Sequence, residues 1–137
     1  MNLKYMPEMD TLYIYLEADI PKIMIPSDID ERVGIFVDKK TKKTLCGYEI
    51  EGAKDFLFSN LNKLELSLKQ KIAVGLYFIR ILKGLSQETM ANEINVSLST
   101  YKYLEKAENN LTFDTFEMIN SKFPMVAKVI GKSLLAS

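Results

Sequence analysis

The feature that most constrains the fold is a change in hydrophobic periodicity near residue 60 of this 137-residue chain. Before that point apolar residues mostly alternate, as in residues 12–16, which is typical of strands with one buried face. Beyond it, apolar residues recur every three or four positions, as in residues 72–82, which is typical of amphipathic helices. The sequence therefore predicts an α+β protein with a sheet module at residues 1–62 and an all-helical domain at residues 63–137.

The sheet module is expected to be small and antiparallel. The alternating segments predict strands at residues 12–16, 23–25, 33–37 and 46–50. A lysine-rich polar stretch at residues 38–44 fits a hairpin loop between the last two strands, and residues 53–61 follow as a short helix. Tyr13 and Tyr15 share one strand face, where we expect them to pack against that helix or against a second copy of the chain.

Composition argues against an enzyme or a metal protein. The chain contains no histidine and one cysteine, Cys46, so the commonest general base and the commonest zinc ligand set are both missing. Glu8, Asp10, Glu49 and Glu51 lie near predicted strand ends, where solvated acids are common, so no metal or cofactor is expected there. Cys46 is expected to be a buried small hydrophobe. No apolar run approaches about 20 residues, so we expect a cytoplasmic protein without membrane contact.

Two capping signals mark the first long helix of the second half. Ser67 followed by Gln70 predicts a capping box, in which the serine oxygen and the glutamine side chain satisfy exposed backbone groups. An apolar stripe then runs from Ile72 to Leu82, and Gly84 is expected to end the helix.

The next segment predicts two short helices joined by a sharp turn. Ser86 and Ser97 can each cap a helix, and Asn95 between them tolerates the left-handed conformation that such a turn requires. Tyr101 and Leu104 are spaced to point inward. The opposite face of the second helix is expected to be exposed and mostly polar, with Leu98, Ser99, Lys102, Tyr103 and Lys106. This is the plan of a helix-turn-helix.

Residues 67–123 resemble the Cro/phage-repressor (Xre-type) helix-turn-helix family, whose pattern is roughly G-L-S-Q-E-E-L-A-x-x-L-G-V-S-x-S-T-I-S-x-I-E-x-G. The outright matches are Gly84, Leu85, Ser86, Gln87, Glu88, Ala91, Val96, Ser97, Ser99, Thr100 and Glu105, with Ile94 and Leu104 as apolar equivalents. The family's next helix is matched by Thr112, Thr115, Phe116 and Ile119. The resemblance implies a five-helix domain that binds the major groove of double-stranded DNA.

The resemblance also implies roles for single residues. Gln87 would contact phosphate, and Leu98, Ser99 and Tyr103 would read bases. Further backbone or base contacts would come from Ser97, Thr100, Lys102 and Lys106, and loop contacts to phosphate from Asn109 and Asn110. Arg80 and Glu105 fall where relatives have a structural salt bridge. If that pair is partly buried, removing one partner costs about 3–5 kcal/mol.

Three departures from the family pattern bear on DNA binding. The turn glycine is replaced by Asn95. The first base-reading position is Leu98, which can contact a thymine methyl group but cannot read guanine. The loop after Glu105 lacks the usual glycine and basic residues, so phosphate neutralisation by each copy should be modest.

Residues 3–57 resemble, more loosely, a small uncharacterised bacterial sheet domain that opens with Y-D-x-E-x-D-A-L-Y-I-x-L and later reads G-I-E-I. The matching residues are Tyr5, Pro7, Glu8, Asp10, Leu12, Tyr13 and Ile14, followed by Gly47, Tyr48, Glu49 and Ile50. The resemblance implies a compact sheet of three or four strands with a helix.

Together these patterns predict a dimeric, sequence-specific DNA-binding regulator, such as a repressor of its own or a neighbouring promoter. Two recognition helices would enter major grooves about 34 Å apart, and the sheet module would serve sensing, dimerisation or partner binding. In the tail, the stripe of Val126, Val129, Ile130 and Leu134 either closes the core or pairs with its copy. One alternative is an antitoxin whose sheet module neutralises a toxin. Another is a protein-interaction adaptor that no longer binds DNA.

Overall fold

The computed structural model describes residues 1–17 and 19–136, with side chains described up to residue 132. The chain divides into two compact units, Met1–Lys63 and a second unit from Leu64 onwards. Each unit is described by itself below. The α+β class expected from the sequence is confirmed, because a sheet of antiparallel strands is followed by helices.

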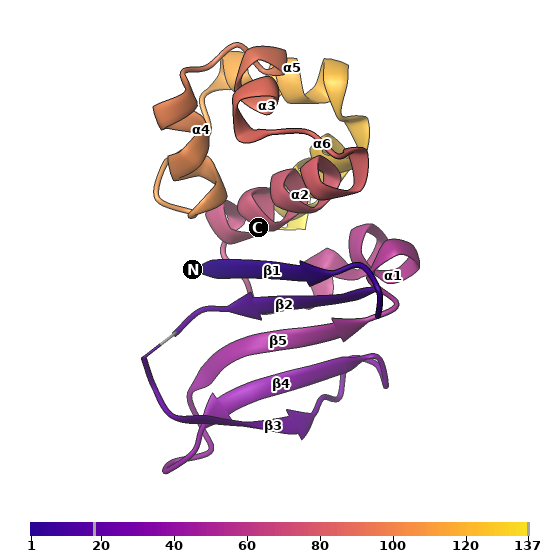
Figure 1. The fold of residues 1–137 in the computed structure, drawn as a ribbon, viewed down its shortest axis with the longest axis vertical. Coiled ribbons are helices and arrows are strands. Elements are labelled where there is room, and N and C mark those ends of the chain that lie inside the picture. Colours follow the sequence, from indigo (N-terminus) through magenta and orange to yellow (C-terminus); the bar gives the residue numbers. More distant parts are fainter. Residues whose placement is uncertain (18, 137) are drawn as a thin grey trace. The chain divides into compact units, whose positions relative to one another are not determined.

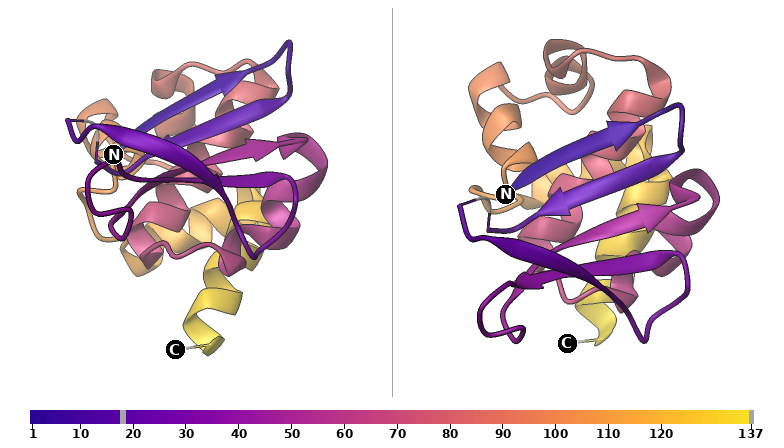
Figure 2. Two further views of the ribbon diagram at one scale, coloured as in Figure 1. Left: turned by 90° about the horizontal axis from the view of Figure 1, so that it is seen from below. Right: turned by 60° about the horizontal axis from the view of Figure 1, so that its bottom comes forward.

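The first unit is a five-stranded antiparallel sheet with the order β1-β2-β5-β4-β3 (Figure 1). Its strands are β1 (Asn2–Met6), β2 (Thr11–Tyr15), β3 (Lys22–Pro26), β4 (Val33–Asp38) and β5 (Leu45–Glu51). The same strand order can be followed in the two turned views of Figure 2. The sequence predicted four of these strands and missed β1, an edge strand in which Tyr5 is buried while Asn2 and Lys4 are exposed.

Alternation along the strands gives the sheet one apolar face, which α1 (Ala53–Asn60) covers. Leu12, Ile14 and Ile50 are fully buried there, together with Phe56 and Leu57 of the helix. Tyr13 and Tyr15 have the opposite parity in β2, so they lie on the other face of the sheet. The expectation that these tyrosines pack against the helix at 53–61 is therefore wrong. A 3-10 turn, η1 (Leu61–Lys63), ends the unit.

Asp10 joins the β1–β2 hairpin to the start of α1. Its carboxylate accepts a 2.6 Å hydrogen bond from the Tyr5 hydroxyl and a 3.1 Å hydrogen bond from the Lys54 backbone N–H. Its carbonyl oxygen accepts from the Ala53 N–H. These hydrogen bonds give Asp10 a structural role, and the described residues contain no group of acids, cysteines or histidines that could hold a metal ion.

The centre of the sheet contains a bulge on β5. Phe36 pairs with Gly47, whereas Val37 pairs with Leu45, which leaves Cys46 as the extra residue. Cys46 is completely buried, as expected for a small hydrophobe. Gly47 has a φ of 157°, and a Cβ atom there would collide with the carbonyl oxygen of Ile14, so only glycine fits this position.

The second unit consists of five helices. They are α2 (Leu68–Lys83), α3 (Gln87–Glu93), α4 (Leu98–Glu105), α5 (Phe113–Lys122) and α6 (Pro124–Ala136). The Ser67–Gln70 capping box is present, and Gly84 ends α2 with a left-handed φ of 67°. The predicted stripe of α2 is wrong at Leu82, which is 38% exposed. No helix in the described part of the chain is long and apolar enough to cross a membrane.

The tail helix α6 closes the core of this unit. Val126, Val129 and Ile130 are buried, and α6 contacts α2 and α5. Gly75 of α2 permits the close approach, because a Cβ atom there would lie 3.2 Å from a methyl group of Val126. The sequence left open whether the tail stripe closes the core or pairs with a second copy, and Val126, Val129 and Ile130 close the core. The side chain of Leu134, the fourth residue of the stripe, lies outside those described.

Candidate nucleic-acid interface

A four-residue connection brings α3 and α4 together as two short helices. Asn95 adopts the left-handed conformation with a φ of 58°, as its position in the sequence predicted. The Val96 N–H donates a 3.0 Å hydrogen bond to the carbonyl oxygen of Ala91, which closes the turn. Met90, Ala91 and Ile94 are buried, and the small Ala91 side chain allows the two helices to pack closely.

Both helices begin with the same cap. The Ser86 hydroxyl accepts from the Thr89 N–H at 3.1 Å, and the Ser97 hydroxyl accepts from the Thr100 N–H at 3.0 Å. Each serine also lies 3.0 Å from the hydroxyl of its threonine partner, to which it donates. The sequence predicted the serine caps but not these hydroxyl pairs. Ser97 and Thr100 are therefore held in fixed positions at the start of α4.

The two faces of α4 differ sharply. Tyr101, Leu104 and Glu105 are buried against the rest of the unit. The outer face is exposed, with Leu98 at 37% and Tyr103 at 45%, and it also includes Ser99, Lys102 and Lys106. The burial pattern thus gives α4 an outward surface that combines two cations, one hydroxyl, one phenol and one leucine.

A buried ion pair fixes α4 to α2. Nε of Arg80 donates to Oε2 of Glu105 at 2.7 Å, and Nη2 donates to Oε1 at 3.0 Å. The Arg80 side chain is 15% exposed and the Glu105 side chain 7%. Nη1 of Arg80 also donates to the carbonyl oxygen of Leu85 at 3.3 Å, at the start of the connection to α3. The guanidinium therefore ties three segments of the helical unit together.

Gln87 joins this network rather than pointing away from it. Its Nε2 donates to Oε1 of Glu105 at 3.3 Å. The sequence resemblance gave Gln87 a phosphate contact and did not indicate this hydrogen bond. Gln87 is half-buried at the start of α3, so its amide adds a neutral hydrogen bond to the ion pair.

Burial and nearby charges shift the pKa values of two residues in the core of this unit, Arg80 and Tyr101. Burial lowers the pKa of Arg80, but the hydrogen bonds and negative charge of Glu105 outweigh this effect and raise it above its ordinary value. Burial, followed by the charge of Glu105, raises the pKa of Tyr101 well above the ordinary tyrosine range. Arg80 therefore stays charged and Tyr101 stays neutral at physiological pH.

The loop after α4 contains a second strained position. Ala107 has a φ of 62°, a left-handed conformation that favours glycine, and it occupies the position of the family's usual glycine. Asn109 is half-buried and Asn110 is exposed. The structure therefore brings Asn110 to the surface of the same unit, while Asn109 is less accessible.

Comparison with known proteins agrees with this geometry. Residues 76–124 match the family model described as helix-turn-helix. The match begins within α2 and includes α3, α4 and α5, so the second unit contains a helix-turn-helix domain. It supports the C-terminal resemblance drawn from the sequence and a DNA-binding regulator of the Cro/phage-repressor type. No curated protein and no solved structure gave a significant match.

Proposed function

We propose that this protein is a sequence-specific regulator that binds double-stranded DNA with the outer face of α4. The observation that carries the proposal is the difference between the two faces of α4. One face is buried and is fixed to α2 by the bidentate ion pair of Arg80 and Glu105. The other face is exposed, and none of the side-chain hydrogen bonds described above involves Ser99, Lys102 or Tyr103. A rigid helix with an exposed polar face in this position is the reading element of a helix-turn-helix.

Each outward side chain suits one kind of contact. Ser99 and Tyr103 reach base edges with hydroxyl groups, and Leu98 at the exposed start of the helix meets a thymine methyl group. Lys102 and Lys106 neutralise phosphates. Ser97, Thr100 and Asn110 contact the backbone from the helix start and the following loop. Asn109, because it is half-buried, and Gln87, because it also donates to Glu105, supply weaker contacts to phosphate.

An apolar groove on the same unit favours a dimer. A pocket of roughly 320 Å³ is lined by Leu68, Leu111, Thr112, Phe113, Phe116 and Ile130. Phe113 is 73% exposed, which is a large apolar exposure for a folded chain. A second copy docked there by a twofold axis would cover the same groove on both copies.

A DNA-binding face and a dimer contact are sufficient for a repressor that acts on its own or a neighbouring promoter. A dimer bound to the operator excludes other proteins from that DNA. An antitoxin would use the same helix-turn-helix and would bind a toxin through the sheet. The two functions differ in one measurable respect. An antitoxin co-purifies with a small toxic protein made from the adjacent gene, whereas a simple repressor is isolated as a homodimer.

The test is selection of bound duplexes from a random DNA pool, performed with the full chain at roughly 50 and 200 mM salt. We expect a near-palindromic site with half-sites one helical turn apart. With Lys102 on α4 and Lys106 at its C-cap in each copy, a dimer neutralises about four phosphates through these lysines, so affinity should fall about a hundredfold between the two salt concentrations.

Two single variants locate the contact. Ser99→Ala and Tyr103→Ala should each weaken specific binding by about 1–3 kcal/mol and leave the fold intact. Lys102→Ala should weaken all duplexes uniformly, with Lys128→Ala on α6 as the charge-matched control. A selection that enriches no DNA sequence would contradict the proposal. So would operator affinity that is unchanged in both Ser99→Ala and Tyr103→Ala.

A further inference from the structure

The sheet face opposite α1 has an aromatic cluster. The rings of Tyr13 and Tyr15 are stacked, with centroids 6.0 Å apart and planes 2° from parallel. The Phe36 ring lies 5.7 Å from Tyr15 across β5, and Met24 on the edge strand β3 is 52% exposed. These four residues, named here the aromatic face, are not used by the helix-turn-helix.

Two glycines give the aromatic face its shape. Gly47 pairs with both Tyr15 and Phe36 and has no side chain, so the two rings meet over it. Gly34 leaves room for the Met24 side chain, since a Cβ atom at Gly34 would lie 2.8 Å from the Met24 sulfur. The result is an apolar surface that extends over four strands, with side chains from β2, β4 and β3 and a glycine from β5.

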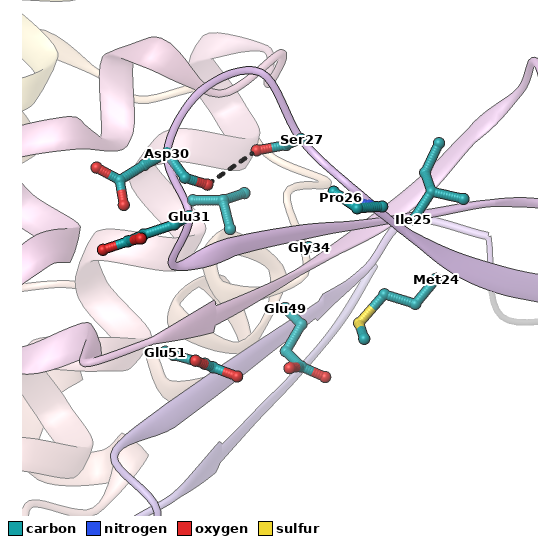
Figure 3. A pocket seen from close by; sticks show the side chains of 10 residues that line it. Met24, Ile25, Pro26, Ser27, Asp30, Glu31, Gly34, Glu49 and Glu51 are labelled. Atoms are coloured by element: carbon teal, nitrogen blue, oxygen red, sulfur yellow. Dashed lines mark hydrogen bonds between the residues drawn. The ribbon is translucent and has the colours of Figure 1, made fainter.

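Carboxylates border this surface. Glu49 pairs with Tyr13 on one side and with Gly34 on the other, and Glu51 follows on the same face. With Asp30 and Glu31 they line a pocket of roughly 240 Å³ beside Met24 (Figure 3). Among the described residues that line the pocket, none is basic. Burial, followed by the nearby charge of Glu51, raises the pKa of Glu49.

This combination matches one kind of side chain. Lysine and arginine have apolar stems and cationic heads, and aromatic faces attract such heads with about 0.5–1 kcal/mol at exposed sites. The chain already shows this contact, because Nζ of Lys22 lies 5.9 Å from the centre of the Tyr15 ring. Nucleic acid could also stack on the rings, but the four carboxylates repel its phosphates.

We propose that the aromatic face and its bordering carboxylates bind a basic segment of a partner protein. The arginine or lysine heads of the segment would lie against Tyr13, the cross-strand neighbour of Glu49, and pair with Glu49 and Glu51. Their stems would lie along Phe36 and Met24. This inference concerns the first unit and does not depend on DNA binding by the second.

The probe is a fluorescein-labelled peptide of alternating arginine and serine, titrated with the full-length protein and followed by anisotropy. The double variant Glu49→Gln/Glu51→Gln should weaken binding about fivefold, because two charge contacts at the protein surface are lost. The control Glu8→Gln/Asp55→Asn removes the same charge from exposed positions off this face, at the β1–β2 turn and on α1. It should change the affinity by less than about twofold.

A second measurement locates the peptide. Backbone amide shifts should move at Tyr13, Tyr15, Phe36 and Glu49 during the titration, and a peptide with glutamate in place of arginine should cause no shifts. Equal affinities for the two double variants, no binding of the arginine peptide, or preferential binding of a single-stranded oligonucleotide would each overturn the proposal.

Discussion

Removing the carboxylate of Glu105 should destabilise the helical unit strongly. The substitution Glu105→Ala leaves the Arg80 guanidinium, 15% exposed, without its two hydrogen bonds to carboxylate oxygens, and it also removes the acceptor of Gln87. Loss of one partner of a buried ion pair costs about 3–5 kcal/mol, because the remaining charge stays desolvated. A domain of this size has a total stability of about 5–15 kcal/mol, so the variant should be near the limit of folding.

The double variant Arg80→Met/Glu105→Leu separates charge burial from packing. It replaces both charges by apolar groups, so its free energy of unfolding should be close to that of the wild type or above it. Arg80→Met alone should be destabilising, because Glu105 is then buried without a cation. With Glu105→Leu as the second single variant, the coupling energy from the double-mutant cycle measures the interaction between Arg80 and Glu105.

The assay is urea denaturation followed by circular dichroism at the helix band, which reports mainly on the second unit. Because the pair is largely desolvated, its contribution should change little between roughly 0.1 and 1 M salt. A loss below about 1 kcal/mol in Glu105→Ala, or a loss that disappears at high salt, would refute the view of a buried, structural pair.

Three further predictions concern single positions. Ala107→Gly should stabilise the helical unit by about 0.5–1 kcal/mol in urea, because glycine accepts the left-handed φ of 62° without strain; a loss of stability would contradict this reasoning. Gly47→Ala should destabilise the sheet by about 3 kcal/mol or more, because the new methyl group collides with the Ile14 carbonyl oxygen, whereas Gly131→Ala, with open space around it, should not. Burial and the hydrogen bond to Asp10 raise the pKa of Tyr5 to about 12, above its ordinary value of 10.0. The stabilisation from this shift is present below pH 10 and lost as pH rises towards 12, so Tyr5→Phe should remove one late step from the tyrosinate absorbance titration.

Local signals in the sequence predicted most of the helical unit. The Ser86 and Ser97 caps, the left-handed Asn95 and the inward Tyr101 each depend on interactions within a few residues, so their sequence pattern is sufficient. Four strands were predicted for the same reason, because alternation is a local property.

Features that depend on distant partners were not predictable. The edge strand β1 is short, ends in two adjacent apolar residues, Tyr5 and Met6, and pairs only with β2. Tyr13 and Tyr15 could not be assigned to a sheet face until the position of α1 was known. The hydrogen bond from Gln87 to Glu105 joins residues 18 positions apart and has no local signal. The DNA contacts of the outer face of α4 stay predictions.

The central claim is that the outer face of α4 lies against base pairs. Its most direct test is a titration of the isotope-labelled full chain with the selected duplex, followed by backbone amide shifts. The account predicts that the largest shifts cluster at residues 97–106, with smaller ones at Gln87 and Asn110. Shifts confined to the sheet unit, or absent from α4 at saturating duplex, would contradict it.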